Sequence, residues 1–103
     1  KNGFAHFFRG ASYLFLGKYK NATADFTTAL KLDDLDFDAM LGLSFTFYKN
    51  KDITNAKLYL DKANNILNIN GNYSDNLDEY QNTYWHQNHF YFLKEMITKM
   101  KAL

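Results

Sequence analysis

Apolar residues along the chain recur every three or four positions, which is the spacing of one face of an α-helix. Ala22, Phe26 and Ala29 illustrate it, whereas the strict apolar–polar alternation of a β-strand is hard to find. The pattern predicts an all-α chain, with helices near 3–16, 19–32, 37–49 and 53–67 and a last helix over about 75–101.

Polar residues between these segments indicate where helices begin and end. Asp36 and Asp52 precede two of the predicted helices, and their carboxylates can accept hydrogen bonds from first-turn amides as N-caps. Residues 68–74 have the composition of a turn, and Gly71 can adopt a positive φ there.

The chain also repeats itself. Residues 3–36 and 37–70 form two blocks of equal length that align without a gap. Small residues meet small ones and large residues meet large ones in the pairs Ala5 and Ala39, Tyr13 and Phe47, Tyr19 and Ile53, Ala22 and Ala56, Phe26 and Leu60, Ala29 and Ala63, and Leu32 and Ile66. Such self-similarity predicts two stacked helical hairpins.

The small and large positions within each block have a physical cause. Two antiparallel helices pack closely only where one presents a small side chain to the bulk of the other. Ala22 and Phe26 are four residues apart and share a helix face, as do Ala56 and Leu60. We therefore expect each alanine to admit a neighbouring helix, and Gly10 to do the same from the first helix, with Ser44 as its counterpart.

This period and pattern resemble those of the tetratricopeptide repeat (TPR) family. The matching positions are Gly10, Tyr13, Gly17, Tyr19, Ala22, Phe26 and Ala29 in the first block, and Leu43, Ser44, Phe47, Ile53, Ala56, Leu60 and Ala63 in the second. The chain departs from the family pattern where His6 and Met40 replace tryptophan, Arg9 replaces leucine and Asp34 replaces proline. The resemblance implies antiparallel hairpins stacked as an α-solenoid, forming a single domain that we expect to be a segment of a longer protein.

In the TPR family, the first helix of each repeat lines a concave groove that holds a peptide or a partner helix. The positions that match this face, our candidate partner-binding residues, are Phe4, Phe7, Ala11, Leu14, Leu41, Phe45 and Tyr48. One subset of the family clamps acidic C-termini with cationic and amide side chains. Phe7, Ala11 and Gly42 stand where three of those would be, so we expect an apolar or amphipathic ligand instead.

The last predicted helix is not a third repeat, because Asp78 and Gln81 fall where a small residue and an aromatic one are needed. It carries its own apolar stripe: Trp85, His89, Phe92, Leu93, Met96, Ile97, Met100 and Leu103. We expect this amphipathic helix to cap the second repeat. Whether it also fills the groove, in place of a partner, is left open by the sequence.

The first helix is apolar on nearly every side, as Phe4, Phe8 and Phe15 show. A helix of this kind is normally buried on more than one side. We therefore expect either further repeats before Lys1 or pairing of the first helix with a second copy of the chain or with a partner.

Composition limits the kinds of ligand and cofactor that the chain can bind. The 103 residues carry a net charge of +1 with both signs interspersed, which gives no basic surface for nucleic acid, and no cysteine is present. No apolar run is long enough for a membrane span. His86 and His89 lie three residues apart but lack further ligands nearby except acids such as Asp78 and Glu79. We expect no catalytic residues, no metal and no cofactor, and a cytoplasmic location.

These observations predict a non-catalytic protein–protein interaction scaffold that binds an apolar or amphipathic segment of a partner in its groove. Two alternatives stay open. In the first, the chain is a structural segment of a longer solenoid or a self-associating unit, and its own helix fills the groove. In the second, the chain is an accessory recruitment domain of an enzyme.

Overall fold

The computed structural model describes residues 2–66 and 77–102. Over these residues the chain is helical and contains no strand. In chain order the elements are α1 (Asn2–Phe15), α2 (Tyr19–Leu32), α3 (Phe37–Lys49), α4 (Ile53–Ile66), the 3₁₀ helix η1 (Leu77–Tyr80), α5 (Tyr84–Asn88) and α6 (Phe90–Lys101). The prediction of four helices forming the two blocks is confirmed. The predicted turn at 68–74 lies outside the described residues.

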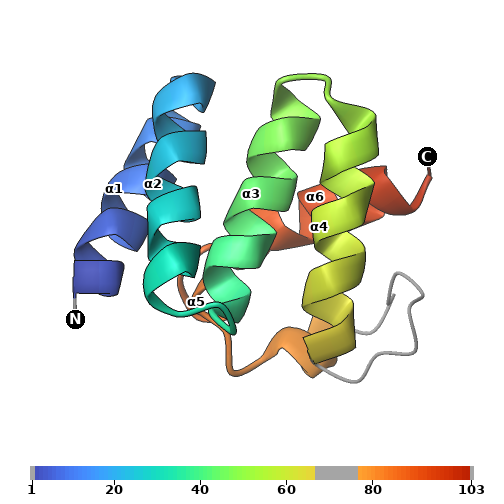
Figure 1. Cartoon of the computed structure of the whole chain (residues 1–103). Coiled ribbons are helices and arrows are strands. Elements are labelled where there is room, and N and C mark those ends of the chain that lie inside the picture. The colour runs from blue at the N-terminus through green and yellow to red at the C-terminus, as the bar shows by residue number, and fades with distance from the viewer. Residues whose placement is uncertain (1, 67–76, 103) are drawn as a thin grey trace.

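The first four helices form two hairpins that stand side by side, α1 with α2 and α3 with α4 (Figure 1). Helix α2 packs against α3 and so joins the hairpins into one layer. Helix α6 runs crosswise behind α3 and α4 (Figure 1). This is the all-α, TPR-like stack of hairpins that the sequence predicts.

Both hairpins turn in the same way. The amide of Lys18 donates to the carbonyl of Tyr13 at 2.8 Å, and the amide of Asp52 donates to the carbonyl of Phe47 at 2.8 Å. In each case an amide beyond the helix end donates to a carbonyl of the last helical turn, which is the hydrogen bond of a Schellman motif. This motif needs one residue in the left-handed conformation. Gly17 supplies it in the first hairpin with φ 79°, and Lys51 in the second with φ 66°.

The predicted packing of small against large residues is confirmed. Ala22, Phe26, Ala56 and Leu60 are all fully buried. The ring of Phe26 faces Gly10, where an added Cβ would stand 3.0 Å from a ring carbon. Glycine therefore brings α1 close to α2, as expected.

Residue Ser44, the counterpart of Gly10 in the second hairpin, packs differently. Its hydroxyl donates to the carbonyl of Ala56 at 2.6 Å, across the interface between α3 and α4. A small polar side chain that is satisfied in this way costs little to bury. The N-cap predictions also hold, because Asp36 accepts from the amide of Ala39 at 3.1 Å and Asp52 from the amide of Asn55 at 3.3 Å.

The prediction of one continuous helix over 75–101 is wrong for the described part of that range. Two local features divide it. Thr83 N-caps α5, with its hydroxyl oxygen accepting from the amide of His86 at 3.2 Å, and His89 leaves helical geometry with φ −140° and ψ 49°. The break at His89 separates α5 from α6, so that each can follow the hairpin layer in its own direction.

Candidate functional site: the concave groove

The face that was predicted to line the groove is covered by the chain's own C-terminal segment, residues 77–102. Five of the seven candidate residues, Phe7, Ala11, Leu14, Leu41 and Phe45, are buried. Tyr48 is half-buried, and Phe4 is 73% exposed. Of the arrangements that the sequence left open, the structure shows the one in which the groove is occupied from within.

Trp85 is the centre of this occupation. Its side chain is fully buried, and its ring centroid lies 5.7 Å from that of Phe7 on α1 and 5.4 Å from that of Phe45 on α3. Both contacts are edge-to-face, the arrangement that aromatic quadrupoles favour. Burial of a side chain of this size contributes on the order of 1.5–3 kcal/mol.

Asp38 fastens the same segment by polar contacts. Its main-chain carbonyl accepts from Nε1 of Trp85 at 2.8 Å, and its carboxylate accepts from the amide of Tyr84 at 2.9 Å. Burial raises the pKa of Asp38 to about 6, and the amide of Tyr84 only partly offsets this. One residue at the start of α3 thus sets the position of α5.

Helix α6 continues the coverage with its apolar stripe. Leu93, Met96, Ile97 and Met100 are buried, and the ring of Phe92 lies 5.5 Å from that of Phe45. The predicted stripe therefore faces the hairpins. Its last residue, Leu103, lies outside the described residues.

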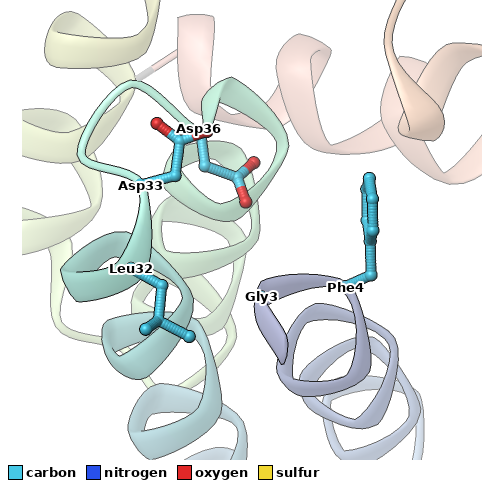
Figure 2. A pocket seen from close by; sticks show the side chains of 5 residues that line it. All are labelled: Gly3, Phe4, Leu32, Asp33 and Asp36. Atoms are coloured by element: carbon cyan, nitrogen blue, oxygen red, sulfur yellow. The ribbon is translucent and has the colours of Figure 1, made fainter. Parts of the chain in front are cut away.

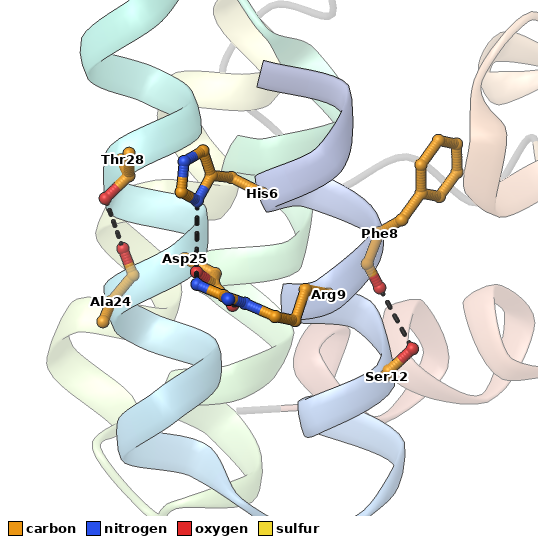
Figure 3. Close-up of polar contacts among 7 residues, drawn as sticks. All are labelled: His6, Phe8, Arg9, Ser12, Ala24, Asp25 and Thr28. Carbon is orange, nitrogen blue, oxygen red and sulfur yellow. Dashed lines mark hydrogen bonds and ion pairs between the residues drawn. The ribbon is translucent and has the colours of Figure 1, made fainter. Parts of the chain in front are cut away.

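Two departures from the TPR pattern are explained by a buried acid. Asp25 of α2 is 4% exposed, and Nε and Nη2 of Arg9 on α1 each donate a hydrogen bond of 2.8 Å to its carboxylate (Figure 3). Nδ1 of His6 lies 3.3 Å from the same carboxylate. The hydrogen bonds from Arg9 lower the pKa of Asp25, so it stays charged beside its partners. Sequence reasoning missed Asp25, although Arg9 and His6, three residues apart on one helix face, were a signal that pointed to it.

The histidines considered for metal binding have other contacts. Nε2 of His89 lies 3.1 Å from the hydroxyl of Tyr84, and the ring of His86 packs on Phe90 at 5.0 Å. Among residues 2–66 and 77–102, no three histidine or acidic side chains are grouped so that they could hold a metal ion. The described helices also include none with the length and hydropathy of a membrane span.

A border of aromatic side chains remains exposed beside the filled groove. Phe4, Phe8 and Phe15 of α1 are 73%, 48% and 45% exposed. Phe8 contacts Tyr84 at 5.4 Å between ring centroids, and Phe15 contacts His89 at 4.7 Å. Two members of this α1 border (Phe4, Phe8 and Phe15) therefore contact the C-terminal segment, namely Phe8 and Phe15.

Comparison with known proteins agrees with the geometry of the first hairpin. A family model described as Tetratricopeptide repeat matches residues 5–34, which span most of α1 and all of α2. Searches of the curated proteins and of the solved structures gave no significant match. Residues 5–34 thus match the tetratricopeptide repeat, and they lie in a TPR-like stack of helical hairpins.

Proposed function

We propose that the chain is a non-catalytic protein–protein interaction scaffold whose groove is closed by its own C-terminal segment, and that a partner binds over the α1 border. The TPR match supports the general role, because this family serves protein binding. The observation that carries the finer proposal is the contrast between Trp85, fully buried in the groove, and Phe4, which is 73% exposed beside it. Exposed aromatic residues that adjoin one another are typical of binding surfaces.

A second candidate keeps the groove itself as the partner site. The C-terminal segment lies in it through apolar anchors, Trp85 of α5 and Phe92 of α6, as the apolar face of a helix lies in a recognition groove. A partner helix of the same chemistry could replace it. Six of the seven candidate residues, all except Phe4, would then become contacts only after the C-terminal segment has left.

One set of variants separates the two candidates. A partner is first identified by crosslinking to the intact chain, and its affinity is then measured for the wild type, Phe8→Ser and Trp85→Ala. We expect Phe8→Ser to weaken binding by about tenfold or more in a chain that circular dichroism shows to be folded. Trp85→Ala should not strengthen binding. Tighter binding by Trp85→Ala, with Phe8→Ser unaffected, would contradict the α1 border and favour the groove.

The same border can pair two copies of this chain, which was the predicted self-association. Light scattering of the wild type and of Phe8→Ser tests it, since a dimer that dissociates on this substitution assigns the border to self-association. A cytoplasmic location and a position beside further repeats or a catalytic domain stay predictions.

A further inference from the structure

A small cavity lies at one end of the α1 border and has four aromatic side chains in its wall. It has a volume of about 100 Å³ and is lined by Phe4, Phe7, Phe8, Asp36, Asp38 and Tyr84. These residues come from three places in the chain, namely α1, the start of α3 and the start of α5. The cavity therefore forms only when the C-terminal segment is in place.

The rings of this cavity meet at steep angles. Tyr84 stands at 85° to Phe7, with centroids 5.0 Å apart, and at 69° to Phe8, with centroids 5.4 Å apart. Phe7 and Phe8 are themselves at 69° and 5.5 Å. Of the rings that line the cavity, Phe7 is buried, and Phe4 and Phe8 are the most exposed. The negative ring faces attract a cation that lies within about 6 Å of the ring centroid.

Two carboxylates complete the lining, and neither has a cationic neighbour. Across residues 2–66 and 77–102, no lysine, arginine or histidine nitrogen lies within 4.0 Å of Asp36 or Asp38. Burial, and to a smaller extent repulsion from neighbouring acids, raises the pKa of both groups. A cation entering the cavity would relieve this unfavourable charge.

A second hollow adjoins the first and shares Phe4 and Asp36 with it. It measures about 110 Å³ and is lined by Gly3, Phe4, Leu32, Asp33 and Asp36. Figure 2 shows Phe4 rising from α1 on one side, with Asp33 and Asp36 on the opposite side, where α2 leads into α3. The surface thus offers further apolar and acidic lining beside the aromatic corner.

We propose that the aromatic corner (Phe4, Phe7, Phe8 and Tyr84, with Asp36 and Asp38) binds the ammonium group of a lysine side chain carried by a partner protein. The methylene stem lies along the exposed ring of Phe4, and the ammonium is held between the ring of Phe8 and the two carboxylates. An ammonium group is compact enough for a cavity of this volume. Because it names the partner's chemistry at the α1 border, this inference rests on the proposed function.

The site can be tested on the intact chain without a partner. The probe is Nα-acetyl-lysine methylamide, and its control is the norleucine analogue, which has the same apolar stem and no amine. We expect the lysine probe to shift the NMR signals of Phe4, Phe8, Asp36 and Tyr84 saturably, with a dissociation constant on the order of 1–10 mM. Equal shifts with the norleucine probe would overturn the proposal, as would tighter binding of the arginine analogue.

Variants locate the interaction. Phe8→Ala removes one wall, and Asp36→Asn removes one charge but keeps an N-cap residue on α3. Each should weaken lysine binding by roughly fivefold, as the loss of one cation–π or charge contact predicts. Phe15→Ala, at the far end of the same border, is the matched control and should leave the dissociation constant unchanged. If Phe8→Ala loses its fold, Asp36→Asn alone decides, and unaltered binding there contradicts the proposal.

The outcome also separates this inference from the proposed function. Saturable lysine binding that Asp36→Asn weakens, in a chain whose partner affinity is unchanged by Phe8→Ser, would support the cavity as a lysine site. It would contradict the use of the cavity and of the α1 border by the identified partner. Absence of saturable lysine binding, together with loss of partner affinity in Phe8→Ser, would contradict the cavity and keep the border.

Discussion

The ring of Phe26 lies so close to Gly42 that a Cβ added there would stand 2.6 Å from two of its carbons. Phe26 extends from α2, and Gly42 lies on α3, so this contact joins the two hairpins. No heavier residue fits at position 42 unless the ring or one of the helices moves. Gly10 of α1 also approaches this ring, so Phe26 is the point where the first three helices meet.

Gly42→Ala should therefore destabilise the chain by about 1–3 kcal/mol, the usual cost of overpacking a core. Thermal or urea unfolding followed by circular dichroism measures this. Gly3→Ala is the matched control, because a Cβ at Gly3 would meet nothing within 4 Å. It should be neutral or slightly stabilising, since alanine favours helix over glycine. An equal effect of both substitutions would contradict the contact.

The two hairpin turns give a pair of opposite predictions. Lys51 holds a left-handed conformation with φ 66° that costs a residue with a Cβ about 1 kcal/mol. Lys51→Gly should therefore stabilise the chain by up to about that amount, and Gly17→Ala should destabilise it similarly. No other atom crowds a Cβ at Gly17, so the second effect would come from the backbone alone. Urea unfolding of both variants checks the signs, and a loss of stability in Lys51→Gly would refute the account.

The carboxylate of Asp38 predicts a pH dependence. Its pKa is raised from 3.8 to about 6 in the folded chain, so the folded state holds this proton more tightly than the unfolded state. The contribution of Asp38 to the free energy of unfolding consequently falls as the pH rises from about 4 to about 6. Above that range, the charged Asp38 destabilises the folded chain by a constant amount.

Asp38→Asn removes the buried charge but keeps an oxygen that can accept from the amide of Tyr84. We expect this variant to be more stable than the wild type at pH 7–8, with the difference shrinking as the pH falls to about 4. Subtracting the two unfolding curves at each pH cancels groups that both proteins share, such as Asp25, whose lowered pKa gives the opposite sign. A difference that does not vary with pH would contradict the buried-charge account.

The pair of Arg9 and Asp25 predicts a result that the TPR pattern alone would not. Arg9→Leu restores the residue usual in the family but leaves the carboxylate of Asp25 buried without its main partner. It should therefore destabilise the chain, although by less than the loss of a fully buried ion pair would, because Arg9 itself is largely exposed. Adding Asp25→Ala to Arg9→Leu should recover part of this loss, and a double-mutant cycle measures the coupling. Additive effects in that cycle would show that the pair is not coupled.

Much of the fold could be predicted from the sequence because the residues that pack between the helices recur in both blocks. Ala22 and Phe26 recur as Ala56 and Leu60, and an interface that occurs twice can be recognised by self-comparison. The role of Gly42 could not be found in this way. Its counterpart in the first block is Phe8, so the two blocks differ at the very position where Phe26 needs space.

The C-terminal segment was harder to predict, for a different reason. Trp85, His89 and Phe92 are spaced as on one continuous helix, so periodicity hides the break that His89 makes. At the break, the ring of His89 packs against that of Phe15, a residue far away in the sequence, with centroids 4.7 Å apart. The apolar character of the groove followed from Phe7 and Phe45, whereas its occupant could be identified only from the tertiary structure.

The central claim is that the chain's own C-terminal segment fills the groove, and Trp85 reports on it directly because it is the sole tryptophan of the chain. Its fluorescence should be blue-shifted and resistant to acrylamide in the native wild type, and NOEs should link its indole ring to Phe7 and Phe45. Emission at the wavelength of the unfolded chain, with full quenching and without those NOEs, would contradict the claim.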